Sequence, residues 1–373
     1  MMQFPNSLIL LLPLHASINL KLVTFYISVI VLLCSCCEGL IRLPTNVTIP
    51  AVFAFGDSTV DHGNNNLIGT LIKCNFPPYG NAFQGGKPTG RFTNGLTPLD
   101  LFAQELGVKD IVPAYNDSNL NDQDLLTGVS FASGGSGYDP QTSALLSVIS
   151  MTDQLEHFKE YIGRVKRAVG EESTTHILRN SVFMVVAGSD DLANTYFTIG
   201  TPRFQYDISS YADLLVASAS SFVKELYKLG ARRISVFGIP PIGCLPSQRT
   251  LAGGLLRLCA EDHNQAALLV NAKLMHELDS LDEIRLPQSR VFYADAYNPL
   301  LDLIQHYQKY GFEVNDIGCC GTGKIEVCIL CNNYSATCAD HSKYIFWDSY
   351  HPTEKAYKAL VNHILPIYIN SLG

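Results

Sequence analysis

The chain has 373 residues, of which 47% are hydrophobic and 16% are charged. This composition supplies a sizeable apolar core, and α/β domains often exceed the usual ~150 residues, so one large domain is plausible. The formal net charge of −8 argues against a polyanionic partner such as nucleic acid. We therefore expect a soluble acidic protein.

The N-terminal segment has the features of a secretory signal. Within residues 1–39 only Lys21 and Glu38 are charged, and an apolar stretch at 22–33 precedes a cluster of small residues. The alternative is an uncleaved membrane anchor, but a run of about 12 apolar residues is shorter than the ~20 needed to span a bilayer. We predict a signal peptide over 1–39, a single domain over 40–373, secretion, and no membrane span after cleavage.

The cysteine content fits an oxidising compartment. Three of the eleven cysteines fall within the predicted signal, and the other eight are Cys74, Cys244, Cys259, Cys319, Cys320, Cys328, Cys331 and Cys338. An even number in a secreted chain indicates disulfides, and the cluster at 319–338 indicates a loop held by them. The alternative is a zinc site using Cys328 and Cys331, which the compartment and the lack of a nearby His-x₃-His pair disfavour. The sequence leaves the pairing open.

Three Asn-x-Ser/Thr triplets agree with secretion. They begin at Asn46, Asn116 and Asn333. Each is a candidate N-glycosylation site if it lies on the surface.

The first predicted strand covers residues 51–55 and runs directly into Gly56, Asp57 and Ser58. A short unbroken apolar run that ends at a glycine is typical of a strand buried on both faces, although a buried helical segment gives the same pattern. Ligands bind at the carboxyl ends of open parallel sheets, so Ser58 stands where chemistry is expected. The plain alternative for this triplet is a tight turn with an aspartate cap.

Further strands are predicted to alternate with helices along the rest of the chain. After a long loop at 61–95, whose length suggests a functional role, the strands are expected at 128–132, 181–187, 234–237 and 291–294. The helices are expected at 97–106, 151–169, 209–229, 260–281 and 299–310. This alternation predicts a three-layer α/β/α sandwich with a mostly parallel five-stranded sheet.

Two residues near the C-terminus complete a possible catalytic set. Asp348 and His351 are three residues apart on a turn, so both side chains can face one target. A serine hydroxyl needs an adjacent base, and an imidazole held by a carboxylate supplies one. Ser58, His351 and Asp348 would form such a triad if the fold brings them together. The Gly-x-Ser-x-Gly elbow of the α/β-hydrolases is absent from the sequence.

Four motifs in order resemble the conserved blocks of the plant GDSL esterase/lipases, which are SGNH hydrolases. These motifs are FGDST at 55–59, GVSFASGGSG at 128–137, AGSDD at 187–191 and FWDSYHPT at 346–353. The resemblance extends over nearly all of residues 50–373 and implies an SGNH, flavodoxin-like fold. The stretch AGSDDLANTYF at 187–197 is most similar to the extracellular-lipase subgroup associated with anthers and pollen coat.

The resemblance also implies the role of each site residue. Ser58 would be the nucleophile, His351 the general base and then acid, and Asp348 the group that orients His351. The oxyanion hole would comprise the backbone N–H groups of Ser58 and Gly135 together with the side chain of Asp190. Gly134 and Gly137 are the alternatives to Gly135.

The third motif departs from the family pattern at Asp190. The family usually has asparagine there, and an ionised carboxylate would repel the developing oxyanion. Loss of one such donor typically costs ~10²–10³ in rate. The alternative is that Asp190 stays protonated in a pocket of low dielectric and donates a hydrogen bond.

These observations predict a secreted serine hydrolase that acts on carboxylic esters and needs no cofactor or metal. Lipid acyl esters are favoured as substrates by the resemblance alone. One alternative is acyl transfer to an alcohol at the same site. Another is a catalytically impaired ester- or lipid-binding protein, which the residue at position 190 motivates.

Overall fold

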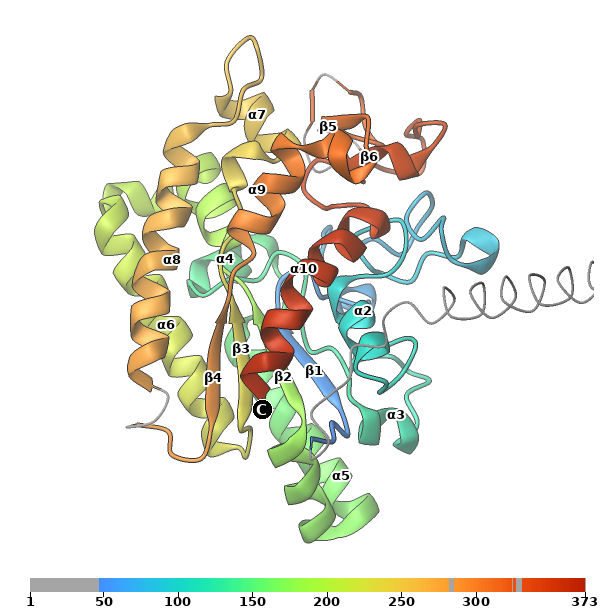
Figure 1. Ribbon diagram of the computed structural model, residues 1–373, viewed down its shortest axis with the longest axis vertical. Coiled ribbons are helices and arrows are strands. Elements are labelled where there is room, and N and C mark those ends of the chain that lie inside the picture. Colours follow the sequence, from blue (N-terminus) through green and yellow to red (C-terminus); the bar gives the residue numbers. More distant parts are fainter. Residues whose placement is uncertain (1–46, 282–284, 324, 327–330, 373) are drawn as a thin grey trace, which may run out of the picture. The chain divides into compact units, whose positions relative to one another are not determined.

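The computed structural model describes residues 47–372, apart from 282–284, 324 and 327–330 (Figure 1). The described residues belong to one compact unit. The predicted signal peptide and the sequon at Asn46 lie outside the described residues, and so does Cys328. Among the residues that are described, no helix has the length and apolar character needed to cross a membrane.

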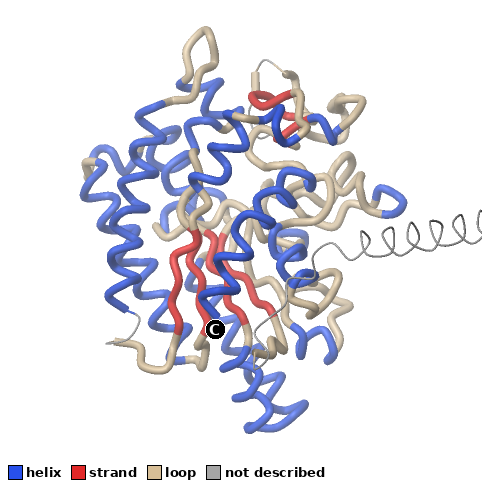
Figure 2. Tube along the Cα trace, in the orientation of Figure 1, coloured by secondary structure: helices blue, strands red, loops and turns tan. Residues whose placement is uncertain are grey.

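A parallel sheet of four strands forms the centre of the fold. The strands β1 (Val52–Gly56), β2 (Val182–Val186), β3 (Arg233–Phe237) and β4 (Arg290–Ala294) pair in that order, all parallel (Figure 2). The strands are apolar on both faces because helices cover both faces. The three-layer α/β sandwich predicted from the sequence is confirmed.

The strand predicted at 128–132 is wrong, because these residues do not form a regular strand. Residues 128–132 lie along the free edge of β1, where Phe131 donates its N–H to the Ala54 carbonyl at 2.8 Å, but only an isolated bridge forms, between Ala54 and Ser130. Gly128 at φ +103° turns the chain at one end, and the glycine-rich turn that follows Ala132 ends the pairing at the other. Too few extended residues remain between these turns for a regular ladder.

One face of the sheet is covered by three long helices, α5 (Met151–Asn180), α6 (Ile208–Lys228) and α8 (Glu261–Leu281). Aromatic rings fill the interface, since Phe55 of β1 contacts Phe158 of α5 and Phe222 of α6 at 5.4 and 5.5 Å between centroids. The backbone of α5 is non-helical at Gly170 (φ +83°, ψ 170°), so α5 consists of two helices separated by a kink, and the first ends where the predicted helix 151–169 ends.

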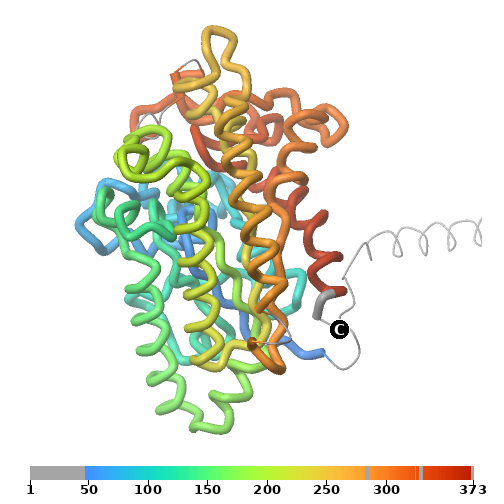
Figure 3. Tube along the Cα trace, turned by 90° about the vertical axis from the view of Figure 1, so that its left-hand side faces the viewer, coloured from blue at the N-terminus to red at the C-terminus, as the bar shows by residue number. Residues whose placement is uncertain are grey.

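The opposite face is covered by α2 (Pro98–Glu105), α9 (Tyr297–Gln305) and α10 (Glu354–Leu372). Figure 3 shows α10 on the other side of the sheet from α5. Short helices connect the layers: α3 (Asp122–Thr127), α4 (Pro140–Leu146) and α7 (Pro246–Ala252). A π-helical segment, η3 (Asp191–Ile199), follows β2 and begins directly after Asp190.

A second, two-stranded parallel sheet carries the C-terminal motif. It pairs β5 (Val314–Gly318) with β6 (Tyr344–Phe346), and Asp348 and His351 follow β6 on a turn. The backbone of Gly318 packs so closely on Asp348 that a Cβ there would lie 2.8 Å from the Asp348 backbone. A side chain at position 318 would therefore displace the acid.

Disulfides hold the segments around this sheet, as predicted. The bonds are Cys244–Cys259, Cys319–Cys338 and Cys320–Cys331. Cys331, one member of the alternative zinc pair, is thus bonded to Cys320 and has no thiolate to offer a metal. In the described part of the chain, no group of three or more metal-binding side chains is found.

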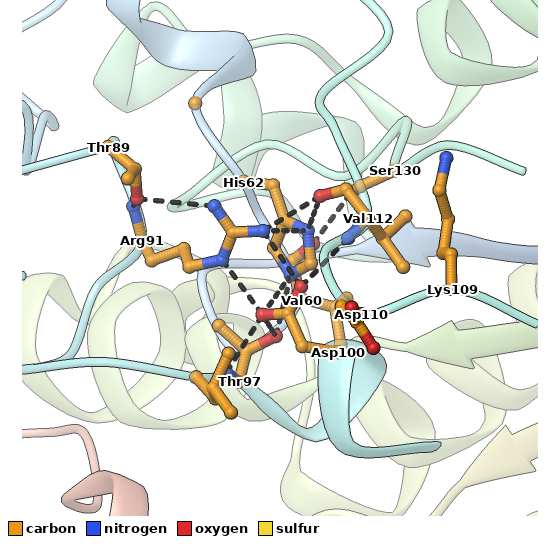
Figure 4. A network of polar contacts seen from close by, with 12 residues as sticks. Val60, His62, Thr89, Arg91, Thr97, Asp100, Lys109, Asp110, Val112 and Ser130 are labelled. Carbon is orange, nitrogen blue, oxygen red and sulfur yellow. Dashed lines mark hydrogen bonds and ion pairs between the residues drawn. The ribbon is translucent and has the colours of Figure 1, made fainter. Parts of the chain in front are cut away.

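A buried polar network fixes the long loop that follows β1 (Figure 4). Arg91 donates two hydrogen bonds of 2.8 Å to Asp100 of α2, and a third to the Val112 carbonyl at 2.7 Å. His62 contacts Val112 O and Thr97 Oγ1 at 2.6 Å each. Burial, together with the charge of Arg91, lowers the pKa of His62 to about 4, so this histidine is neutral in the network. The network joins the loop to α2.

Candidate active site

The turn after β1 places Ser58 at the carboxyl end of the sheet. Gly56 is required there, because at φ +128° any Cβ would overlap the Val186 backbone of β2. The next residue, Asp57, accepts a hydrogen bond from the Thr59 N–H at 2.9 Å and so closes the turn. Burial raises the pKa of Asp57 to about 6. The sharp turn exposes the Ser58 side chain beyond the sheet edge.

Ser58, His351 and Asp348 form a continuous hydrogen-bonded chain. The Ser58 Oγ lies 2.7 Å from His351 Nε2, and His351 Nδ1 lies 2.9 Å from both carboxylate oxygens of Asp348. The Asp348 Oδ1 also accepts the backbone N–H groups of Tyr350 and His351 at 2.9 and 2.7 Å. The fold therefore brings together three residues that are up to 293 positions apart in the sequence.

The electrostatics of the pair suit a base held by an acid. Burial disfavours the charged form of Asp348, but the charge of His351 and its hydrogen bonds outweigh burial and hold the pKa of Asp348 below its usual value. Burial also disfavours the charged imidazolium of His351 and would lower its pKa. The neighbouring carboxylates, of which Asp348 has the largest effect, outweigh burial and raise the pKa of His351 above its ordinary value.

Tyr79, from the long loop after β1, was not predicted to belong to this site. Its hydroxyl donates to Asp348 Oδ2 at 2.7 Å, which gives the buried carboxylate a further donor. Its ring contacts Trp347, the residue before Asp348, at 6.2 Å between centroids. The loop that looked functional in the sequence thus reaches the acid of the triad.

Asp190 lies on the wall of the same cavity as Ser58. Its Oδ1 accepts a hydrogen bond of 2.5 Å from Asn194 Nδ2, and the Asn194 Oδ1 accepts the Tyr350 hydroxyl at 2.8 Å. Burial, with the nearby carboxylates of Asp57 and Asp191, raises the pKa of Asp190 to about 8. Near neutral pH the carboxyl is therefore mostly protonated. Asn194 and Tyr350 were also not predicted from the sequence to belong to this site.

The glycine-rich turn of the second motif offers three candidate glycines. The N–H of Gly134 already donates to Asp61 Oδ2 at 2.9 Å. A Cβ on Gly137 would overlap the Asp191 carboxylate, so a glycine here allows the backbone of the turn to lie against Asp191. Gly135 lies at φ +84°, with its Cβ position 2.7 Å from Leu146 and 3.7 Å from Ile72. Gly135 is not among the described residues that line the cavity, whereas Ser58 and Asp190 are.

An apolar cavity opens at Ser58. Its lining comes from the turns that carry Ser58 and His351, from α2 and α10, from β2 and the residues that follow it, from the segment between the end of β3 and α7, and from the start of α9. The polar side chains include Ser58, Asp190 and His351 at one end. Such a site, apolar with a few converging polar groups, is the usual form of a small-molecule pocket.

The described glycosylation candidates differ in exposure. Asn333 is exposed, next to the disulfide-held loop, and Asn116 is half-buried, with its backbone N–H bonded to Asn64 Oδ1 at 3.0 Å.

Comparison with known proteins identifies the family of this chain. Residues 52–364 match the family model described as GDSL-like Lipase/Acylhydrolase. The chain is 57% identical to the GDSL esterase/lipase EXL3 of Arabidopsis thaliana over 331 residues, which is 88% of this chain and 90% of that protein. It is 46% identical to the GDSL esterase/lipase EXL2 of the same plant over 376 residues, which is 95% and 99% of the two chains. With this coverage and identity, the chain belongs to the GDSL esterase/lipase family and is a carboxylic ester hydrolase.

Proposed function

We propose that this protein is a secreted serine esterase that hydrolyses lipid acyl esters through an acyl-enzyme on Ser58. One observation carries the proposal. The hydroxyl of Ser58 lies 2.7 Å from a histidine that is itself held by a buried carboxylate, and this serine opens onto an apolar cavity. The arrangement supports nucleophilic catalysis with a histidine base.

The first half-reaction forms the acyl-enzyme. His351 Nε2 takes the proton of Ser58 Oγ while Oγ bonds to the ester carbonyl carbon, and the carbonyl oxygen becomes an oxyanion. The imidazolium then gives this proton to the alkoxy oxygen, the carbon–oxygen bond breaks, and the alcohol leaves. Asp348 stays ionised throughout and stabilises the imidazolium, as its low pKa supports.

The second half-reaction releases the acid. A water molecule gives a proton to His351 and attacks the acyl carbon. His351 then returns the proton to Ser58 Oγ as the ester bond to the serine breaks. The net change is hydrolysis of one ester to an acid and an alcohol.

We assign the oxyanion hole to the N–H groups of Ser58 and Gly135 and to the protonated carboxyl of Asp190. Support for Asp190 comes from its place on the cavity wall and from Asn194, which donates to Oδ1 and leaves Oδ2 to carry the proton. Support for Gly135 over Gly134 is that the Gly134 N–H is already bonded to Asp61. A neutral carboxyl can donate a hydrogen bond as the usual asparagine amide does.

Secretion rests on separate observations. The sequence predicts a signal peptide over 1–39, and three disulfides join six of the cysteines that follow it. Disulfides form and persist in oxidising compartments, and the exposed sequon at Asn333 fits the same route. Expression with the native N-terminus should yield a cleaved, glycosylated protein in the medium. Retention of the full-length chain inside the cell would contradict this assignment.

The test of the catalytic assignment is covalent labelling with a fluorophosphonate. The mature protein and its Ser58→Ala variant are compared, and the adduct is located by mass spectrometry. A serine reacts with this probe only where a base and an oxyanion site activate it. We expect one adduct, on Ser58, and none in the variant. No labelling of a folded wild-type protein would instead favour the impaired binding protein.

A further inference from the structure

The cavity at Ser58 continues beneath helix α10. This helix packs against α2 on one side and against β4 on the other, and Figure 1 shows it crossing in front of the sheet. The strand β2 is the second of the four strands, and its residues Met184 and Val186 line the cavity. The space under α10 is therefore a slot that is continuous with the reactive serine.

The walls of this slot are apolar on both sides. Tyr357, Val361 and Ile364 recur at helical spacing on the buried stripe of α10. Met184 and Val186 are alternate residues of β2 and so point to the same face of the sheet.

The titratable Asp and His side chains that line the cavity lie near Ser58 and not in the slot. Among the described lining residues they are Asp57, Asp190 and His351, and all three belong to the reactive end. Apart from the hydroxyl of Tyr357, the wall residues named above offer a ligand only hydrophobic contact.

Aromatic rings of α2, β3 and α10 pack together along the slot. The ring of Phe102 from α2 lies 5.7 Å from Tyr368 of α10 and 6.1 Å from Phe237 of β3, between centroids. Ile364 precedes Tyr368 by one helical turn and is the last residue of α10 to line the cavity. From Tyr357 to Ile364 the helix advances seven residues, or about 10 Å at 1.5 Å per residue.

We propose that this slot binds the acyl chain of the substrate and limits it to about eight carbons. The inference rests on the proposed function, in which Ser58 attacks the ester carbonyl at the mouth. An extended hydrocarbon advances about 1.25 Å per carbon for bonds near 1.52 Å, so about 10 Å accommodates about eight carbons. Each CH₂ group that enters the slot should raise kcat/KM about fourfold, until the chain meets Ile364 and Phe102.

The experiment compares 4-nitrophenyl esters with acyl chains of two to sixteen carbons. For the wild type, kcat/KM is expected to rise to a maximum near eight carbons and to fall for longer chains. In Ile364→Phe the larger ring fills the end of the slot, so the eight-carbon ester should lose at least tenfold while the four-carbon ester changes less than twofold. In Ile364→Ala the maximum should move to longer chains.

Ile367→Phe is the matched control, because Ile367 is on the same helix but is 54% exposed. It should leave the chain-length profile unchanged. A profile that neither Ile364 variant alters, in proteins that melt cooperatively, would overturn the proposal.

A binding measurement separates this inference from the proposed function. Calorimetric titration of octanoic acid into Ser58→Ala reports on the slot without any turnover. Weaker binding when Ile364→Phe is added would support the slot even if the wild type hydrolysed no ester, an outcome that would reject only the esterase assignment. Unchanged octanoic acid binding would reject the slot whatever the esterase activity.

Discussion

Asn194 donates a hydrogen bond of 2.5 Å to Asp190 Oδ1 from one helical turn further along η3. This contact fixes one oxygen of the carboxyl as an acceptor. The other oxygen, Oδ2, is the one that we propose donates to the oxyanion in place of an asparagine amide nitrogen. The substitution of an acid for the usual amide is thereby compatible with an oxyanion hole, provided that the acid keeps its proton.

The protonation of Asp190 can be tested by Asp190→Asn. The amide retains an acceptor for Asn194 and supplies a permanent donor, so kcat near neutral pH should be kept or raised. In the wild type, activity should fall as the pH rises through about 8, because Asp190 then ionises and its charge opposes the oxyanion. The variant should lose this alkaline decline in a profile of kcat against pH.

Asp190→Ala is the control for that experiment. It removes the donor without adding a charge, and should lower kcat by ~10²–10³ at every pH. A comparable loss in Asp190→Asn would show that the carboxyl itself, and not a neutral donor, is required.

The acid side of the profile should report His351. The base must be neutral to accept the serine proton, so activity should rise with pH through the pKa of His351. That pKa lies above its ordinary value, since the nearby carboxylates outweigh burial. The rate of fluorophosphonate labelling, measured from pH 5 to pH 9, should therefore have its acid midpoint above about 6.5. A midpoint well below this would mean that the imidazolium is not stabilised as the geometry indicates.

The triad could be predicted from the sequence because its residues stand in short motifs, each at the end of a strand or on a turn. Tyr79, Asn194 and Tyr350 could not, since their partners depend on how loops fold back. Tyr79 is 269 residues from Asp348, and no local pattern relates them. The strand predicted at 128–132 was wrong because hydrophobicity cannot show that Gly128 adopts a left-handed backbone beside β1.

Tyr79→Phe tests the support of the triad acid. The variant keeps the ring against Trp347 but removes the hydroxyl that donates to Asp348 Oδ2 at 2.7 Å. A hydrogen bond to a charged group contributes ~1.5–3 kcal/mol, so a loss of about tenfold in kcat is expected, with KM little changed. Tyr344→Phe, in a residue that packs against the same hydrophobic cluster, should have no such effect. Equal losses in both variants, or a loss confined to KM, would contradict a role for Tyr79 through Asp348.

Arg91→Met should destabilise the fold more than it affects the chemistry. Arg91 and Asp100 are both buried and joined by two hydrogen bonds of 2.8 Å, and removal of the arginine leaves a buried carboxylate without its cation. Breaking such a pair typically costs ~3–5 kcal/mol of the free energy of unfolding, which a denaturant titration would measure.

Lys159→Met, which breaks an exposed pair with Glu156, should cost about 1 kcal/mol or less. Because the penalty comes from the stranded charge, the double variant Arg91→Met/Asp100→Leu should recover part of the loss. A double variant less stable than Arg91→Met would instead mean that the hydrogen bonds of Asp100 to the Thr97 and Val112 N–H groups dominate the stability of this network.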